Sequence, residues 1–266
     1  PGTVLENNGT ATISGGEVLV DGGDLQTAVL QNNGTLLVEA NGAITCKGSI
    51  ANGNTATLTN KGTITISGSL MNVGTIQNRA GTITLDPNTR AVFQNGGEQA
   101  SDTPVTFTNQ GTLTIGLGCT FENTGSFTNE GTCTNGGTFD HNGTGSNEKD
   151  FINNGTFDNN GANARCNVEA PFTNNVTFDN NGANAQCNVK AEFVNSKGAT
   201  FKNGNGAECN LENNKTAVFT NNGTFENGEN AVCNVRAKFV NSEGATFENG
   251  DGAECNLENN ETAVFT

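Results

Sequence analysis

The chain has 266 residues and a formal net charge of −15, with 36 glycines, no tryptophan, no tyrosine and one methionine. Only 33% of its residues are hydrophobic, which excludes the core of an ordinary globular enzyme. The acidity argues against nucleic acid as a partner, because phosphates require basic patches. No apolar run is long enough to span a membrane.

The first part of the chain, residues 1–154, repeats irregularly. Apolar and polar residues alternate as in β-strands in the segments 16–21, 63–66, 82–85 and 112–115. Dividing the chain at each Gly-Thr gives six repeats, at residues 9–33, 34–61, 62–80, 81–110, 111–130 and 131–154. The longest contains Pro87 and Pro104, which predict a loop. We expect a second loop at residues 141–150, which would include the only histidine, His141.

The second part, residues 155–266, repeats regularly. Its five units cover residues 155–175, 176–197, 198–222, 223–243 and 244–266. Each contains Thr-Phe, an Asn/Gly turn, Cys-Asn-Val or Cys-Asn-Leu, and a second Phe segment. Repeats of this length, with strands between turns, are typical of a solenoid in which each repeat forms one coil.

We therefore predict an all-β fold: one parallel β-solenoid (β-helix) domain over residues 1–266, with about eleven coils of roughly 19–30 residues. No segment has the apolar period of a helix. The general preference for right-handed crossovers predicts a right-handed coil. The recurrent Asn-Gly and Asn-Asn-Gly turns are expected to use positive φ angles. Asparagines stacked at one corner can also hydrogen-bond along the column.

Two columns in residues 155–266 indicate stacked coils. The residue three places after each cysteine alternates in charge, and these residues are Glu169, Lys190, Glu212, Arg236 and Glu258. In parallel strands about 4.8 Å apart, each charge would lie between opposite charges. We interpret this column as a charge ladder.

The second column contains one cysteine per repeat: Cys166, Cys187, Cys209, Cys233 and Cys255. Each cysteine precedes an aliphatic residue by two positions, so both side chains share one face of a strand. A buried thiol column is the first interpretation, because free cysteine is often buried. Disulfides between coils or chains are the alternative. Metal binding is disfavoured, because one thiol per coil gives a row rather than a tetrahedron.

Three other surface features suggest functions. Asn-x-Thr places potential glycosylation sites at Asn8, Asn33, Asn142, Asn154, Asn175, Asn214, Asn222 and Asn260, although the same pattern is simply a turn followed by a strand. Asp158 and Asp179 occupy equivalent positions in adjacent repeats and could share a Ca²⁺ ion. No other cofactor is expected, and Lys202 in the same column weighs against calcium.

Thr-x-Thr pairs begin at residues 10, 63, 82 and 112 and are similar to the flat threonine arrays of ice-binding solenoids. Outward threonine is also what β propensity predicts. We predict no enzyme activity and no catalytic residue, because one histidine in a loop supports no catalytic arrangement.

The sequence Phe-Thr-Asn-Asn-Gly-Thr-Phe at residues 219–225, and its variant at 151–157, resembles the repeats of prokaryotic surface β-solenoids: adhesin passengers, fibre proteins and archaeal sheath proteins. This resemblance implies export to the cell surface and a structural or adhesive role. We expect an extracellular structural protein that stacks head to tail with copies of itself into a filament or sheath. The alternative is a segment of an adhesin that binds a glycan or a partner cell.

Overall fold

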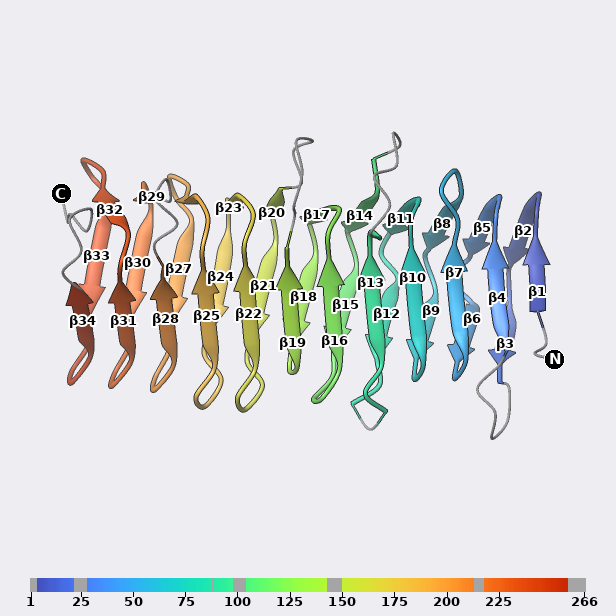
Figure 1. The fold of residues 1–266 in the computed structure, drawn as a ribbon, viewed down its shortest axis with the longest axis horizontal. Coiled ribbons are helices and arrows are strands. Elements are labelled where there is room, and N and C mark those ends of the chain that lie inside the picture. The colour runs from blue at the N-terminus through green and yellow to red at the C-terminus, as the bar shows by residue number, and fades with distance from the viewer. Residues whose placement is uncertain are drawn as a thin grey trace. The chain divides into compact units, whose positions relative to one another are not determined.

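The described part of the chain is built from β-strands alone. The computed structural model describes residues 4–21, 28–87, 89–97, 104–142, 150–212 and 218–257. These residues form 34 short strands and no helix, so the described part has no helical segment that could cross a membrane. The strands form three parallel sheets, which we name A, B and C (Figure 1). The predicted parallel β-solenoid is confirmed, while its handedness stays a prediction.

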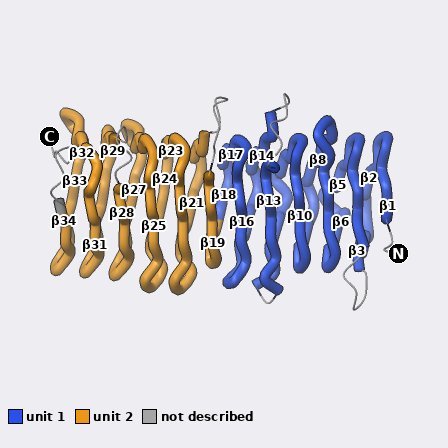
Figure 2. The backbone as a smooth tube through the Cα atoms, viewed as in Figure 1, with its two compact units in different colours: residues 1–133 blue, residues 134–266 orange. Residues whose placement is uncertain are grey.

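The chain divides into two compact units, residues 1–133 and residues 134–266 (Figure 2). Each coil gives one strand to sheet A, one to sheet B and one to sheet C. The described residues form six such coils up to β18 (Thr132–Asn135), a strand that crosses the division between the units. Beyond β18 they form five coils and the further strand β34 (Glu254–Leu257).

The strands of unit 1 are as follows. Sheet A contains β1 (Val4–Asn7), β4 (Val29–Asn32), β7 (Ser49–Asn52), β10 (Ser69–Asn72), β13 (Val92–Asn95) and β16 (Thr120–Asn123). Sheet B contains β2 (Thr10–Ile13), β5 (Thr35–Val38), β8 (Thr57–Asn60), β11 (Thr75–Asn78), β14 (Thr106–Asn109) and β17 (Ser126–Asn129). Sheet C contains β3 (Gly16–Val20), β6 (Gly42–Cys46), β9 (Thr63–Ile66), β12 (Thr82–Leu85), β15 (Thr112–Ile115) and β18.

The strands of unit 2 repeat the pattern. Sheet A contains β19 (Thr138–His141), β22 (Arg165–Val168), β25 (Gln186–Val189), β28 (Glu208–Leu211), β31 (Val232–Val235) and β34. Sheet B contains β20 (Phe151–Asn153), β23 (Phe172–Asn174), β26 (Phe193–Asn195), β29 (Val218–Asn221) and β32 (Lys238–Asn241). Sheet C contains β21 (Thr156–Asn159), β24 (Thr177–Asn180), β27 (Thr200–Asn203), β30 (Thr224–Asn227) and β33 (Thr246–Asn249).

Most strands have four residues, of which the second and fourth point inward. In β12, for example, Ile83 and Leu85 are buried while Thr82 and Thr84 face outward. The alternation follows from the two-residue period of a strand. Each coil therefore buries only a few side chains, so the low hydrophobic content of the sequence still provides a continuous core.

The core changes in composition along the chain. In the early coils it is aliphatic, with residues such as Ile44, Ile64 and Ile83 in register in sheet C. In unit 2 phenylalanines replace them, and those of sheet C form an almost parallel stack. The ring centroids of Phe157, Phe178, Phe201, Phe225 and Phe247 lie 4.9 to 5.1 Å apart in succession. Stacks at this spacing combine large buried area with favourable ring contacts.

The predicted repeats are partly wrong, because they do not all begin at a strand of the same sheet. Two of the predicted boundaries, Gly9 and Gly34, precede strands of sheet B, whereas the boundaries at Gly62, Gly81, Gly111, Gly131 and Gly155 precede strands of sheet C. The predicted repeat 34–61 consequently contains four strands, β5 to β8, rather than three. The reason is that the same turn followed by a strand occurs at more than one corner of the coil.

Candidate functional site

Asparagines, most of them buried, form hydrogen-bonded columns at the corners of the coils. In each column, which we call an inner asparagine ladder, the side-chain Nδ2 of one coil donates to Oδ1 of the next coil at 2.6 to 2.9 Å. In unit 1 the ladders follow sheet A (Asn7, Asn32, Asn52, Asn72, Asn95, Asn123) and sheet B (Asn60, Asn78, Asn109, Asn129). In unit 2 they follow sheet B (Asn153, Asn174, Asn195, Asn221, Asn241) and sheet C (Asn135, Asn159, Asn180, Asn203, Asn227, Asn249). The predicted asparagine ladders are confirmed.

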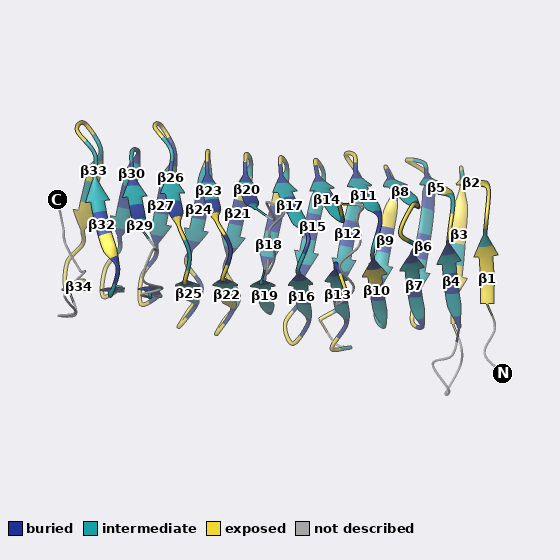
Figure 3. Cartoon of the chain, turned by 45° about the horizontal axis from the view of Figure 1, so that its top comes forward, coloured by how far each residue is buried: buried dark blue, intermediate teal, exposed yellow. Residues whose placement is uncertain are grey.

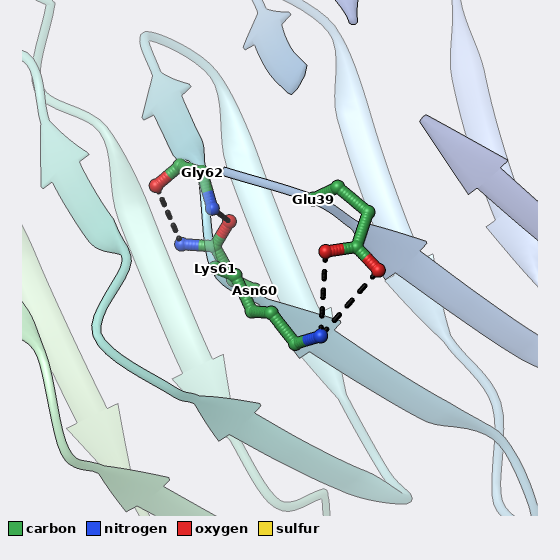
Figure 4. Close-up of polar contacts among 4 residues, drawn as sticks. All are labelled: Glu39, Asn60, Lys61 and Gly62. Carbon is green, nitrogen blue, oxygen red and sulfur yellow. Dashed lines mark hydrogen bonds and ion pairs between the residues drawn. The ribbon is translucent and has the colours of Figure 1, made fainter. Parts of the chain in front are cut away.

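Many ladder side chains also hold the turn that follows them, as at Asn60, Asn72 and Asn221. Oδ1 of Asn60 accepts from the backbone N–H of Gly62 at 3.2 Å, and its Nδ2 donates to the Gly62 carbonyl at 3.3 Å (Figure 4). The same Nδ2 donates to the Thr82 carbonyl of the next coil at 3.1 Å. The following residue, Lys61, points outward and pairs with Glu39 at 3.3 Å. A buried amide therefore stabilises a corner only because its hydrogen bonds are satisfied.

The expectation that Asn-Gly turns use positive φ holds at only some of them. Gly96 and Gly206, each preceded by an asparagine, have φ angles of +114° and +69°, whereas Gly34 and Gly223, in Asn-Asn-Gly turns, do not have positive φ. Other positive φ angles fall at asparagines outside these turns: Asn163, Asn184 and Asn230. The turn glycines are needed for space: a Cβ on Gly34 would lie 2.1 Å from the Gly9 carbonyl oxygen. Close approach of one coil to the next therefore selects glycine at this corner.

The five predicted cysteines lie in register in sheet A. Cys166 pairs with Cys187, and the column continues through Cys209 and Cys233 to Cys255. All five are free thiols; the first four are buried and Cys255 is half-buried. The hydrogen bond between the Cys187 and Cys166 thiols raises the pKa of Cys187 well above its usual value, and burial adds to this effect. The pKa values of Cys209, Cys233 and Cys255 are raised in the same way, so these three thiols and Cys187 are poor nucleophiles, since the reactive form is the thiolate.

The predicted charge ladder lies just beyond the same strands. Glu169, Lys190, Glu212 and Arg236 each donate a backbone N–H to the preceding coil, which places them in equivalent positions. Lys190 Nζ lies 2.9 Å from Glu169 Oε1, and both side chains are partly exposed. Its hydrogen bond and attraction to Glu169 raise the pKa of Lys190, with a smaller contribution from Glu212. Glu258 lies outside the described residues.

An outer asparagine ladder, which was not predicted from the sequence, lies on the outward face of sheet A. It contains Asn167, Asn188, Asn210, Asn234 and Asn256. Here Nδ2 donates to the preceding coil, at 2.8 to 3.0 Å, which is opposite to the direction in the inner ladders. At its start, Asn167 donates to Asp140 Oδ1 at 2.6 Å. The Cys-Asn-Val repeat contained this signal, because the residue after each inward cysteine must point outward.

Asp158 and Asp179 are adjacent on the outward face of sheet C, followed in the same column by Lys202. Desolvation raises the pKa of both carboxyl groups, and Asp158 raises that of Asp179 further while Lys202 lowers it. Oδ1 of each carboxylate is buried without a hydrogen-bond partner. Calcium takes six to eight oxygen ligands. Among the described residues, no group of three or more acidic, cysteine or histidine side chains is arranged to hold a metal ion.

The prediction that His141 lies in a loop is wrong. His141 ends strand β19 and is fully buried, with its ring 6.0 Å from that of Phe151. It occupies the inward corner position that later sheet A strands fill with Val168 or Val189. The signal at His141 was misleading because residues 142–150, which follow it, contain no strand pattern. Residues 143–149 lie outside the described part.

The potential glycosylation sites lie mostly on turns. Asn8, Asn33, Asn154 and Asn175 are exposed, whereas Asn142 and Asn222 are half-buried. Asn214 and Asn260 lie outside the described residues. Four of these asparagines are therefore accessible to a modifying enzyme.

Comparison with known proteins gives no relative from which a function could be transferred. The chain matches no protein-family model, no curated protein and no solved structure. The functional argument therefore depends on the chain's own surfaces.

Proposed function

We propose that the chain is an extracellular structural protein whose copies stack end to end, coil upon coil, into a filament or sheath. The observation that supports this proposal is the way the described coils stack, because each coil offers the same strand edges and inward columns to the next; the first described coil, β1 to β3, shows these edges and columns uncovered by other described residues. Leu5 in β1 is 55% exposed, although Leu30 and Ile50, which follow it in the same inward column, are 3% and 0% exposed. Figure 3 shows the exposure along β1. Burial of one such leucine contributes roughly 1.5 to 3 kcal/mol.

The strand edges of this coil favour the same kind of contact. Among the described residues, β1, β2 and β3 each pair with another strand on one side only. Unpaired edges of this kind are templates for another strand. The last described coil of a second copy would offer Phe239, Phe247 and Cys255 in the same inward columns. This contact joins two different surfaces, so it repeats without closing.

The polar corners limit the strength of the contact. The first coil has Asn7 at the sheet A corner but Ile13 and Val20 at the other two corners. The last described coil has Asn241 and Asn249 at the sheet B and C corners, which would meet these aliphatic residues. Their amides already donate to Ala245 and Ala253 carbonyls at 3.1 and 2.8 Å, which offsets part of the cost. We therefore expect reversible, concentration-dependent stacking.

An extracellular location is supported by the accessible Asn-x-Thr sites. The acidic surface fits a solvated structural role, since net charge keeps proteins soluble. The resemblance to surface β-solenoid repeats points the same way.

The test is analytical ultracentrifugation over rising concentration, with negative-stain electron microscopy of the same samples in the presence and absence of reductant. The variant Leu5→Lys should abolish stacking. Leu19→Lys is the matched control, because Leu19 is 56% exposed in the same coil but faces outward from β3. A monodisperse wild-type monomer at high concentration would contradict the proposal and favour the adhesin segment. Filaments that dissolve in reductant would assign a cross-linking role to cysteines.

A further inference from the structure

The outward face of sheet C in unit 1 is a regular array of threonines. Strands β6, β9, β12 and β15 are neighbours in this sheet (Figure 1). Their outward threonines form two columns, which we call the threonine face: Thr63, Thr82 and Thr112 in the first, and Thr45, Thr65, Thr84 and Thr114 in the second. Each of these strands pairs with the next without a shift in register.

The first column alone would carry no argument. Threonine occupies the same strand position in sheet C of unit 2, at Thr156, Thr177, Thr200, Thr224 and Thr246, where it follows each turn. The second column is the informative one. In unit 2 it contains Asp158, Asp179, Lys202, Glu226 and Glu248. The repeat therefore accepts charge at this position, yet in unit 1 the same column is threonine four times in succession.

The threonine face is uncharged in an otherwise strongly acidic protein. The net charge is −15, with 27 acidic and 12 basic residues. None of these lies among the outward residues of β6, β9, β12 and β15. A surface without charge does not recognise an ion, a nucleic acid or a charged protein. Its occupant must instead be matched by hydroxyl and methyl groups.

The area of the threonine face argues against a second protein as its binding partner. Four rungs about 4.8 Å apart and strands about 13 Å long give a surface of roughly 250 Å². A stable protein interface buries about 800 Å² on each partner. The face is therefore too small to hold a protein partner by itself.

The spacing of the threonines is that of a crystalline surface. Neighbouring rungs lie about 4.8 Å apart, and the two threonines of a rung, two residues apart, lie about 6.7 Å apart. This gives a rectangular grid whose repeat distances are close to those between oxygen atoms on a prism face of ice. β-branched side chains have restricted χ1 angles, so the array is held in place before binding and little entropy is lost on contact.

We propose that the threonine face binds ice, with its hydroxyl and methyl groups ordering water into the lattice of the crystal surface. This activity does not depend on end-to-end stacking. It needs only one unit with its sheet C face exposed to water.

The test is inhibition of ice recrystallisation together with thermal hysteresis, measured on the full chain. The wild type should inhibit recrystallisation and shape ice crystals. Thr84→Lys, which puts a long charged side chain at the centre of the array, should reduce the inhibition at least tenfold. Thr120→Lys is the matched control, because Thr120 faces outward from β16 in sheet A and should leave the activity unchanged. Circular dichroism melts of both variants keep a folding defect distinguishable from a binding defect.

Three results would overturn the proposal. The first is a folded wild type without effect on ice growth. The second is equal activity in Thr84→Lys and Thr120→Lys. The third is a chain that self-associates through this face, so that Thr84→Lys changes its sedimentation rather than its effect on ice; the face would then be a contact between copies. Failure of Leu5→Lys to change any of these measurements bears only on stacking.

Discussion

At the scale of the residue, buried asparagine carries most of the specificity of this fold. Asn174 donates to Asn195 Oδ1 and to the Thr200 carbonyl, both at 2.9 Å, and accepts from Asn153 at 2.8 Å. A buried amide is costly unless its donors and acceptor are satisfied. The ladder thus penalises any register other than the observed one, because a slip would leave several amides unpaired.

We predict that Asn174→Ala destabilises the chain by about 3 kcal/mol or more, because several buried polar groups lose a partner at roughly 1 to 3 kcal/mol each. The adjacent Asn175→Ala is the matched control: Asn175 is exposed and bonded to Asn154, so its loss should cost less than about 1 kcal/mol. Urea denaturation measures both. Equal losses would contradict the assignment of stability to the inner ladders.

A second prediction concerns Asp158, whose carboxyl pKa is raised by desolvation. A raised folded-state pKa means that the native state binds more protons than the unfolded state. Stability therefore falls as pH rises from the unfolded pKa through the folded pKa, and the full penalty is present at neutral pH. Asp158→Asn should accordingly stabilise the chain at pH 7, by no more than about 0.5 kcal/mol after solvent screening.

The measurement is the melting temperature at pH 7 and at pH 3, where the gain should disappear. Glu226→Gln is the comparison: it removes a carboxylate from the same column beside Lys202 and should lower stability at pH 7. A gain for Asp158→Asn that is the same at both pH values would contradict desolvation as its cause.

At the scale of the element, turns and strand ends are fixed by the close spacing of successive coils. Glycine serves two different purposes. At Gly223 a Cβ would lie 2.3 Å from the Ala199 carbonyl oxygen, whereas Gly198 has open space around it but a φ of +81°. The first position needs a small residue, and the second needs a residue that tolerates the left-handed region.

These two glycines should respond differently to substitution. Gly223→Ala should cost about 1 to 3 kcal/mol through overpacking, and Gly223→Asn should be worse. Gly198→Ala should cost about 1 kcal/mol, while Gly198→Asn should recover much of the loss because asparagine enters the left-handed region more readily. Thermal denaturation of the four variants checks this. Rescue by asparagine at both positions would contradict the distinction.

The charge ladder is a weaker feature of the same strands. Lys190→Glu would put a third negative charge beside Glu169 and Glu212, and we expect a loss of up to about 1 kcal/mol at low salt. The loss should largely disappear at 1 M salt, where the screening length is about 3 Å. Lys197→Glu changes the net charge equally at an exposed position and is the control. A loss for Lys190→Glu that is independent of salt would indicate a packing effect instead.

At the scale of the whole molecule, the sequence predicted the repeat architecture because that architecture depends on local rules. Strand alternation, Gly-Thr sites and equally spaced cysteines indicate stacked coils without any knowledge of long-range contacts. The stacking register of Cys166 and Cys187 follows from their spacing alone. The asparagine ladders were also predictable, since a column of turn asparagines can satisfy itself.

The features that sequence reasoning missed depend on contacts between coils. Whether Gly34 is needed for φ or for space depends on the distance to Gly9 in another coil. The burial of His141 depends on the strands on which it packs. The repeat boundaries before Gly62 were predicted at the wrong corner because strands of sheet B and strands of sheet C can both follow a Gly-Thr turn. The threonine pairs that begin at residues 63, 82 and 112 were identified from the sequence, but only the register shows that they share one face of sheet C with Thr45, while the pair that begins at Thr10 lies in sheet B.

Hydrogen exchange of asparagine side chains, followed by NMR with selective ¹⁵N-asparagine labelling, tests the stacked-coil account most directly. The account predicts that the side-chain NH₂ groups of the buried ladders, such as Asn174, Asn195 and Asn203, persist in D₂O long after those of exposed asparagines such as Asn154 and Asn175 have exchanged. Exchange of all asparagine side chains at one common rate would show that the ladders do not form, and the register of one coil on the next would then be wrong.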